Sequence, residues 1–487
     1  MLYIVAFLGA AGFRLFFAYP LEITEGASMQ LVRAILRGQP LYTEPTLEHV
    51  PMIYGPVYYY AAALVSLVGG PTFGTLRVVS LVASIGSIGL IGLIIRRETC
   101  SRIASVVGAG VFAASYPLAD GTLDLGRVDA TMLASLLAAF YLIRLTGLRS
   151  ALIAGSLIAL SVLTKQAAAP LALILGLYLL VADRRRLAAY LLGLVVALSV
   201  PIALLELQSG AWATLFLFQL PRQHQISELR LDQFWRLWIL PRFTLALPLG
   251  MLFFFSRLVA RQYQTALFYS LTTIGMLGIA LASDANPGAS LNVLLPAYAM
   301  LAILFGLGLD EGLRQLNQAQ QQARTYWVFA VCVGILQLVL LIYNPRLMVP
   351  YRSDLWADER LAATLTALPG NLFAPDYDAF VQQRARYTEQ PFAGAFAELI
   401  GGYGGSGDPE SGVLLERLHE RLVQREYDYV VLDPDSQWFF FSGAVKSAGY
   451  VDVGPLFPPN DEFWLWRTSI SPRSELYVPR ERSNPSP

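Results

Sequence analysis

The sequence has little charge and almost no cysteine. Of its 487 residues only 14% are Asp, Glu, Lys or Arg, about half the usual share in soluble domains, whereas 55% are hydrophobic. This composition excludes an ordinary soluble enzyme and a disordered chain. The 35 basic residues balance the 35 acidic residues, so no net charge attracts nucleic acid and we expect no such partner. The two cysteines, Cys100 and Cys332, can form neither a disulfide framework nor a zinc cluster.

Long apolar runs take the place of the missing charge. A hydrocarbon core accepts about 20 residues of helix, which predicts an α-helical polytopic membrane protein. Segment 56–69 is short and contains three consecutive tyrosines after Pro56 and Val57, which is typical of an interfacial helix or a partial insertion. We therefore expect about 11 spans, over residues 1–19, 75–95, 102–119, 129–146, 150–164, 167–182, 187–206, 242–259, 265–282, 290–308 and 326–343.

Basic residues beside these segments predict the orientation. If segment 56–69 does not cross, all the basic clusters fall on one side, which the positive-inside rule makes cytoplasmic. We therefore expect a multi-pass protein of the cell membrane with a cytoplasmic N-terminus and an extracytoplasmic C-terminus. The clusters are Arg96, Arg97 and Arg102; Arg144 and Arg149; Arg184 to Arg186; Arg257 and Arg261; and Arg314 and Arg324.

Composition changes from about Asn344, where charge, Gly and Pro increase. Short apolar runs at 371–374, 429–432 and 463–466 are typical of strands, and a charged helical stretch leads into the second. We predict a membrane-embedded catalytic domain over 1–343, a small extracytoplasmic α/β domain over 344–480 and a disordered tail over 481–487. Residues 401–407 are expected to form a flexible loop.

The loop after the first expected span contains two acids, Glu22 and Glu25. Thr24 is positioned to cap a helix that runs to Arg37 and ends at Gly38, with apolar residues on one side. We expect this amphipathic helix to lie on the outer surface and to hold both acids at the membrane boundary. The alternative is that the acids only stabilise the N-terminus of the helix.

A second acidic group lies between the spans 102–119 and 129–146. It contains Asp120, Asp124, Arg127 and Asp129, and by the same topology it shares the outer face with Glu25. Asp129 is the strongest candidate because it begins an apolar run, where an ionised side chain is costly. The alternative is that these are ordinary loop acids that face water.

Lys165 and Gln166 lie between two short apolar segments on the same face. A lone ammonium near carboxylates and Arg127 suits a phosphate-bearing ligand, although snorkelling of the lysine is an alternative. The loop 207–241 adds Arg222 and His224 among aromatic residues, which favours either a cover for a lipid headgroup or simple anchoring.

These segments together resemble a known family. Glu25-Gly26, the stretch 33–42 and the stretch 54–59 are similar to the first outer loop of the GT-C integral membrane glycosyltransferases. The resemblance is to the bacterial branch of protein O-mannosyltransferase-like and aminoarabinose transferase-like enzymes (glycosyltransferase 39/83-like). Residues 126–130 resemble its second acidic motif, 163–166 its Thr-Lys-Gln element and 287–292 the segment that opens a late span. The first acid is often Asp in this family, and here it is Glu25.

The resemblance implies transfer of a hexose or pentose from a polyprenyl-phosphate carrier to a glycan, lipid or protein acceptor outside the cytoplasm. Single displacement with inversion is expected, with Glu25 as the general base and Asp129 as the second catalytic acid. A divalent metal bridging Glu25 and Asp129 is a further expectation. The lipid tail is expected near segment 56–69. The residues expected to bind the donor and its phosphate are Tyr54, Tyr59, Arg127, Lys165 and Gln166.

Two other classes of protein also contain many apolar segments. A lipid or solute transporter commonly shows paired halves with broken helices at the midplane, and this sequence has no such repeat. A membrane-anchored binding protein working through residues 344–487 would make the many spans superfluous. The sequence therefore favours the transferase over both, and it indicates no particular oligomeric state.

Overall fold

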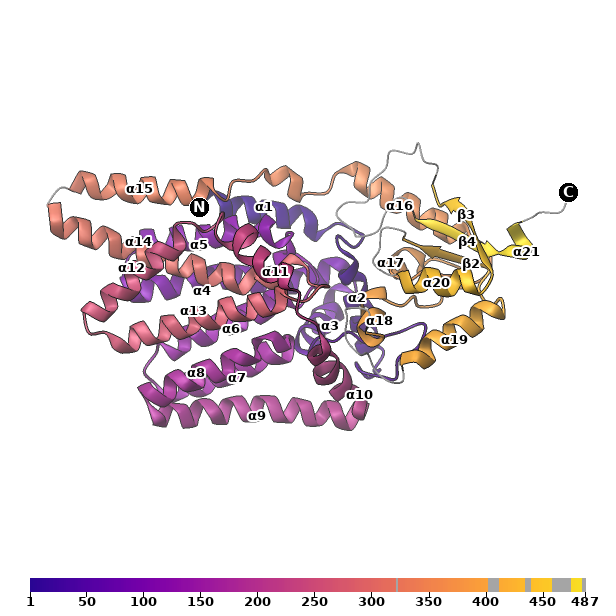
Figure 1. The fold of residues 1–487 in the computed structure, drawn as a ribbon, viewed down its shortest axis with the longest axis horizontal. Helices are drawn as coiled ribbons and strands as arrows, with labels where there is room; N and C mark the ends of the chain where they lie inside the picture. Colours follow the sequence, from indigo (N-terminus) through magenta and orange to yellow (C-terminus); the bar gives the residue numbers. More distant parts are fainter. Residues whose placement is uncertain (321–322, 402–410, 434–438, 458–473, 484–487) are drawn as a thin grey trace.

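A computed structural model describes all residues except 321–322, 402–410, 434–438, 458–473 and 484–487. The long helices lie side by side in a bundle, with a small sheet beyond one end of it (Figure 1). Each of the expected spans contains one helix of this bundle, which confirms the α-helical class. These helices are α1 (Leu2–Leu15), α4 (Phe73–Thr99), α5 (Arg102–Ala114), α6 (Asp129–Ile143), α7 (Leu148–Thr164), α8 (Ala169–Ala182), α9 (Arg184–Ser209), α12 (Ala246–Val259), α13 (Tyr263–Asp284), α14 (Leu295–Gln320) and α15 (Ala323–Val339).

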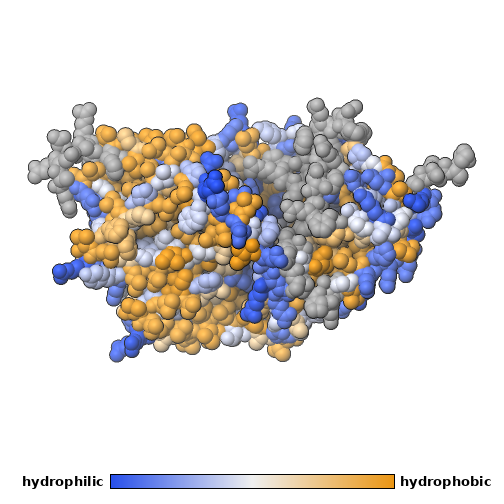
Figure 2. Space-filling view, viewed as in Figure 1, coloured by the Kyte–Doolittle hydropathy of each residue, from blue (hydrophilic) through white to orange (hydrophobic). Residues whose placement is uncertain are grey.

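The bundle has the surface of a membrane protein. Four helical stretches are long and apolar enough to cross a membrane, namely α4, α9, α13 and the run Leu291–Leu316. Seven shorter apolar helices accompany them in the described part of the chain. Apolar side chains cover most of the bundle in Figure 2, while polar ones gather over the end with the sheet. The number of crossings stays a prediction.

Local signals explain where the bundle helices begin and end. The side chain of Asp183 accepts hydrogen bonds from the backbone N–H groups of Arg185 and Arg186 and so caps the start of α9. Gly210, at a φ of 60°, ends the same helix. Helix α14 lies at the centre of the bundle, and 89% of its apolar window is buried.

Helix α3 (Val57–Gly69) begins and ends at the same end of the bundle. The N–H of Gly55 donates to the carbonyl of Thr164 at the end of α7 (3.2 Å). Tyr58 and Ser66, near the two ends of α3, contact Leu76 and Thr75 in the first turn of α4. This course is the one expected of a segment that does not cross.

Basic residues meet at the end of the bundle away from the sheet. Arg97 donates to the carbonyl of Arg144 (2.7 Å), and Arg314 donates to that of Thr99 (2.6 Å). Arg186 donates to the carbonyl of Ile143 (2.5 Å). Residues from distant loops thus share one face, as the positive-inside argument requires, and its cytoplasmic location stays a prediction.

The connecting segments gather at the other end. They are α2 (Ile23–Leu36), α3, α10 (Ala211–Thr214), α11 (Glu228–Gln233) and the short 3-10 or π turns η1 (Tyr116–Ala119), η2 (Thr122–Asp124), η3 (Gln166–Ala168), η4 (Leu215–Gln219), η5 (Leu220–Gln223), η6 (Phe234–Ile239), η7 (Leu291–Leu294) and η8 (Pro345–Met348).

The C-terminal segment contains a sheet of order β1-β2-β4-β3, in which β1 and β2 are parallel and the other pairs are antiparallel. The strand expected at 463–466 and most of the loop at 401–407 lie outside the described residues. Helix α21 occupies the start of the expected tail. The elements are α16 (Arg352–Ala367), β1 (Leu372–Phe373), α17 (Asp378–Val381), α18 (Ala393–Leu399), α19 (Ser411–Val423), β2 (Tyr429–Leu432), α20 (Phe439–Ser447), β3 (Tyr450–Pro455), β4 (Glu475–Pro479) and α21 (Arg480–Ser483).

Helix α2 is packed between the bundle and the C-terminal segment, so it does not have the exposed face expected of an amphipathic helix on the outer surface; its location on the outer side stays a prediction. Most of its residues are buried, and Gln30 donates to the carbonyl of Gln390 (2.6 Å). The predicted cap is wrong. Glu22, not Thr24, is the N-cap, because its carboxylate accepts the backbone N–H of Thr24 (3.0 Å).

Candidate functional site

Glu25 is fully buried in the first turn of α2, where Arg77 of α4 neutralises it. Arg77 donates from Nε to Oε1 (2.9 Å) and from Nη2 to Oε2 (2.7 Å). The N–H of Gly126 donates to Oε1 (2.7 Å), and the N–H of Leu21 donates to Oε2 (2.8 Å). Burial alone would raise the pKa of Glu25. Arg77 and the backbone donors together lower it by more than burial raises it, so this pKa lies below its ordinary value. The carboxylate is thus held ionised with four donors.

Asp124 belongs to a separate buried ion pair. Arg14 of α1 lies 3.0 Å from its Oδ1, and the hydroxyl of Tyr116 donates to the same oxygen (2.8 Å). Both charged side chains are at most 2% exposed. This pair joins α1 to the turns η1 and η2, which is a structural role.

Asp129 is the centre of a second charged group, at the start of α6. Lys165 Nζ donates to its Oδ1 at 2.7 Å, and Asn292 Nδ2 donates to the same oxygen at 2.8 Å. Arg127 Nε donates to its Oδ2 at 3.3 Å. The structure therefore brings Lys165 to Asp129, 36 residues away in sequence, and to its neighbour Arg127. The three residues were predicted to share one site.

Arg127 extends this group to Glu22. Its Nη1 lies 2.9 Å from Glu22 Oε2 and 3.1 Å from Thr24 Oγ1. Glu22, Arg127, Asp129 and Lys165 thus form a continuous series of alternating charges. The side chain of Glu22 is 21% exposed and that of Asp129 only 1%, so Glu22 is the carboxylate of the series that solvent reaches.

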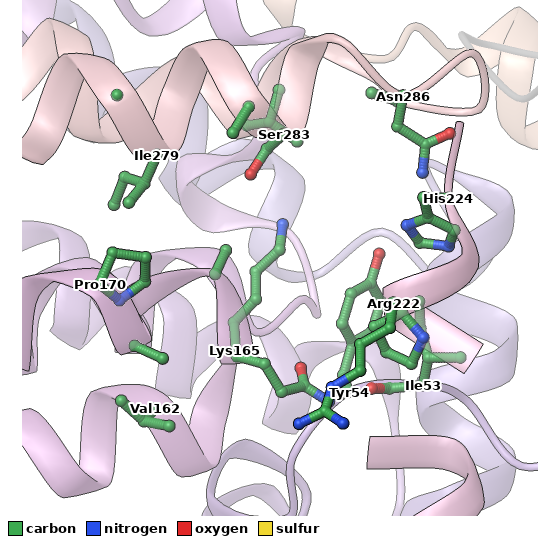
Figure 3. A pocket seen from close by; sticks show the side chains of 18 of the residues that line it. Ile53, Tyr54, Val162, Lys165, Pro170, Arg222, His224, Ile279, Ser283 and Asn286 are labelled. Carbon is green, nitrogen blue, oxygen red and sulfur yellow. Dashed lines mark hydrogen bonds between the residues drawn. The ribbon is translucent and has the colours of Figure 1, made fainter. Parts of the chain in front are cut away.

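A cavity of about 730 Å³ adjoins Lys165. Its apolar walls come mainly from α8 and α13, including Pro170, Ile174 and Ile279. Figure 3 shows the side chain of Lys165 reaching into the cavity between this apolar side and a polar side. The polar side includes Tyr54, Arg222, His224, Asn286, Asn292 and Glu398.

Tyr54 stands beside Lys165 because of a close approach of the backbone. The ammonium of Lys165 lies 5.4 Å from the centre of the Tyr54 ring, within the range of a cation–π contact. The next residue, Gly55, touches the end of α7, and a Cβ there would lie 1.9 Å from the carbonyl oxygen of Leu163. Glycine is therefore required for the loop to bring Tyr54 to the cavity.

The predicted donor-binding residues differ in their relation to the cavity. Lys165, Gln166 and Tyr54 line it. The amide of Gln166 donates to the carbonyls of Ile53 (2.5 Å) and Leu217 (2.9 Å), so it fixes two lining loops. Arg127 lies outside the lining and contacts Asp129, the partner of Lys165. Tyr59 is fully buried outside the lining, and its hydroxyl is 3.5 Å from the sulfur of Met52.

Several residues of the site were not predicted. Arg77 lies in the first turn of an expected span, and Asn292 was noted only as part of the segment that opens α14. Glu398 comes from the C-terminal segment, which carried no site prediction. Arg77 could have been suspected, because an arginine inside an apolar helix requires a buried partner.

The predicted metal bridge between Glu25 and Asp129 does not fit the donors around these acids. Glu25 accepts four hydrogen bonds, and Asp129 accepts bonds from two cationic side chains and an amide. A divalent ion requires free carboxylate oxygens and is repelled by adjacent ammonium and guanidinium groups. Among the described residues, no cluster of three His, Cys, Asp or Glu has the arrangement of a metal site.

The helical bundle with the small sheet beyond one end has the fold of solved GT-C integral membrane glycosyltransferases. Within it, residues 50–205 match the family model described as dolichyl-phosphate-mannose-protein mannosyltransferase. The resemblance to the GT-C glycosyltransferases that the sequence motifs indicated is confirmed. No protein of the curated set matches the sequence.

Solved structures share this fold at low sequence identity. ArnT from Cupriavidus metallidurans bound to undecaprenyl phosphate is 14% identical, with a TM-score of 0.62 over 100% of this chain and 98% of that one. AglB from Archaeoglobus fulgidus, an oligosaccharyltransferase in complex with an inhibitory peptide and a dolichol-phosphate, is 13% identical. Its TM-score is 0.55, over 95% of this chain and 74% of that one.

Proposed function

We propose that this protein transfers a sugar from a polyprenyl-phosphate carrier to a hydroxyl acceptor on the outer side of the membrane. The observation that carries the proposal is the cavity, which combines apolar walls from α8 and α13 with the cations Lys165 and Arg222. A lipid phosphate has the same division into an apolar tail and an anionic head. The undecaprenyl phosphate in ArnT and the dolichol-phosphate in AglB support the choice of carrier.

Lys165 and Arg222 are the proposed partners of the phosphate. The charge of Lys165 is matched by Asp129 at 2.7 Å. Arg222 lines the cavity and forms no ion pair with any residue that the structure describes. An incoming phosphate can therefore pair with Arg222, which has no counter-charge of its own, and with the side of Lys165 that faces the cavity. The negative charge that develops on the leaving phosphate would be stabilised in the same way.

Glu22 is the proposed general base. A base needs a free lone pair near the acceptor, whereas both oxygens of Glu25 are saturated by donors. Glu22 is partly exposed and lies in the same charged series as Lys165. The role predicted for Glu25 stays a prediction that this geometry disfavours, and Arg77 gives Glu25 a structural role instead.

The proposed reaction is a single displacement. The acceptor oxygen attacks the anomeric carbon as its proton passes to the carboxylate of Glu22. The bond between the anomeric carbon and the phosphate oxygen breaks, and the polyprenyl phosphate leaves with the electron pair. Attack from the face opposite the phosphate inverts the anomeric centre. No step requires a metal or a redox partner.

A donor-consumption assay tests the proposal. Purified protein is incubated with a panel of polyprenyl-phosphate hexoses and pentoses and a membrane extract that supplies acceptors. We expect the wild type to consume at least one donor. Lys165→Ala and Arg222→Ala should each reduce kcat/KM by about 10- to 100-fold, the worth of one charge-assisted hydrogen bond.

The matched control is Arg236→Ala. Arg236 lies in the same loop, is 73% exposed and pairs only with Asp232 in the described part of the chain. It should retain full activity. If the wild type consumes none of the donors, or both cavity variants match the wild type, the proposal is wrong.

A further inference from the structure

Glu398 is the residue through which the C-terminal segment enters the cavity. The other described residues that line the cavity lie between Ile53 and Val293. Glu398 is carried by α18, and its Oε2 lies 2.6 Å from Nε2 of His224, in the loop after η5. The side chains are 14% and 23% exposed. The pair therefore faces the interior of the cavity without being sealed off from solvent.

The cavity contains three chemically different regions in succession. The apolar walls of α8 and α13 form the first, and Lys165 lies next to them. Figure 3 shows His224 beside Asn286 on the side of Lys165 away from Pro170 and Ile279. A lipid-phosphate sugar has three parts in the same order: an apolar tail, a phosphate and a sugar. With the phosphate at Lys165, the sugar extends toward His224 and Glu398.

The pair has the hydrogen-bonding groups that a sugar needs. One oxygen of Glu398 meets His224, and the other accepts no hydrogen bond from any described residue. A carboxylate with a free oxygen accepts bonds from neighbouring hydroxyls of a sugar ring. The imidazole and the amide of Asn286 add donors and acceptors beside it. This combination of polar groups suits a hydroxyl-rich sugar ring and does not suit an apolar lipid tail.

Helix α18 holds Glu398 on a fixed support. The backbone N–H of Ala393, at the start of α18, donates to Oδ1 of Asp376 (2.8 Å). Phe396 is fully buried and stacks on Phe440 of α20, with ring centres 5.8 Å apart. A side chain on such a support loses little entropy when it binds a ligand, as specificity residues require.

We propose that Glu398, together with His224, binds the sugar of the donor and determines which sugar the protein accepts. This assignment rests on the proposed function and adds the sugar-binding residues to it. The C-terminal segment thereby takes part in donor selection. In this assignment Glu398 binds the sugar, while Lys165 and Arg222 bind the phosphate.

The test compares two lipids that differ only in the sugar. Affinities of the purified full-length protein are measured for polyprenyl phosphate and for the glycosylated polyprenyl phosphate that the donor panel identifies. We expect the wild type to bind the glycosylated lipid about tenfold more tightly, the worth of one or two hydrogen bonds. Glu398→Gln and His224→Gln should each remove most of that factor and leave the affinity for polyprenyl phosphate unchanged.

Glu389→Gln is the matched control. Glu389 pairs with Arg37, the residue that follows α2, at 2.6 Å, so this variant also removes an ion pair between the C-terminal segment and the rest of the chain. It lies outside the cavity lining and should keep the tenfold factor. If Glu398→Gln fails to fold, His224→Gln alone decides the result.

The outcomes separate the two proposals. If the wild type binds neither lipid, the proposed function fails. The sugar assignment is overturned alone if the wild type binds both lipids equally or if the cavity variants keep the tenfold factor. Equal weakening of both lipids in these variants would also overturn it, because that result indicates displacement of α18.

Discussion

At the scale of single residues, the sequence located charged side chains but could not assign their roles. Asp129 and Lys165 were recognisable because an ionised group in an apolar run needs a partner, and they are in fact partners. Residue type and position did not distinguish Glu22 from Glu25, and only the family resemblance favoured Glu25. The structure separates them, because only the position of Arg77, 52 residues away in the chain, shows which acid is saturated.

Substitution of the two acids distinguishes their roles. Glu25→Gln leaves Arg77 buried without a counter-charge and should destabilise the protein by about 3 to 5 kcal/mol. Glu22→Gln keeps an acceptor for the N-terminus of α2, so the protein should fold normally while kcat falls about 100-fold or more. Thermal unfolding and donor turnover measure the two effects. A stable, inactive Glu25→Gln protein together with an active Glu22→Gln protein would reverse the assignment.

At the scale of elements, the helices of the bundle were predictable and their contacts were not. Apolar length located a helix in each expected span, including the short pair α7 and α8. Helix α9 shows the limit, because its apolar window is only 11% buried and its sequence looks equally apolar all round. What fixes it is a close approach of Gly155 in α7 and Gly193 in α9, which the hydropathy pattern does not reveal.

The packing of α7 on α9 should fail when either glycine acquires a side chain. A Cβ at Gly155 would lie 2.0 Å from the carbonyl oxygen of Tyr190, and one at Gly193 would lie 2.1 Å from that of Leu152. Gly155→Ala and Gly193→Ala should each cost about 1 to 3 kcal/mol and lower the thermal midpoint in detergent. Gly89→Ala, where nothing lies within 4 Å, is the control and should be at least as stable as the wild type, because alanine favours a helix more than glycine does. Unchanged midpoints in both packing variants would contradict this contact.

At the scale of the whole molecule, the C-terminal segment covers the loops that carry the site. The change of composition near residue 344 indicated a separate segment but not where it docks. The contact of Gln30 with Gln390 joins residues 360 positions apart, and such contacts form only when the chain folds and leave no pattern in the sequence. For that reason the sequence did not reveal that the C-terminal segment covers α2, and it missed Glu398.

Asp358 in α16 predicts a pH dependence of the whole fold. Its side chain is 1% exposed, its Oδ1 has no described partner, and burial raises its pKa to about 8 from 3.8. The folded protein therefore holds a proton that the unfolded chain loses, so stability decreases as pH rises from about 4 to about 8.

Asp358→Asn should remove this decrease. At pH 9 the variant should be more stable than the wild type by an amount on the order of 2 to 4 kcal/mol, and near pH 4 the two should be alike. Thermal midpoints across this range measure the difference. Glu359→Gln, at an exposed neighbouring position, is the control. A constant difference between variant and wild type at every pH would contradict the buried, protonated state.

The central claim is that a lipid-phosphate donor lies between α8 and α13 with its phosphate at Lys165. The most direct measurement uses polyprenyl phosphate with a photoreactive group near the start of the tail, followed by mapping of the cross-linked peptides. We expect cross-links within Ala169–Ala182 and Tyr263–Asp284, reduced in Arg222→Ala. Cross-links confined to α3, where the sequence had indicated the tail, would contradict the account.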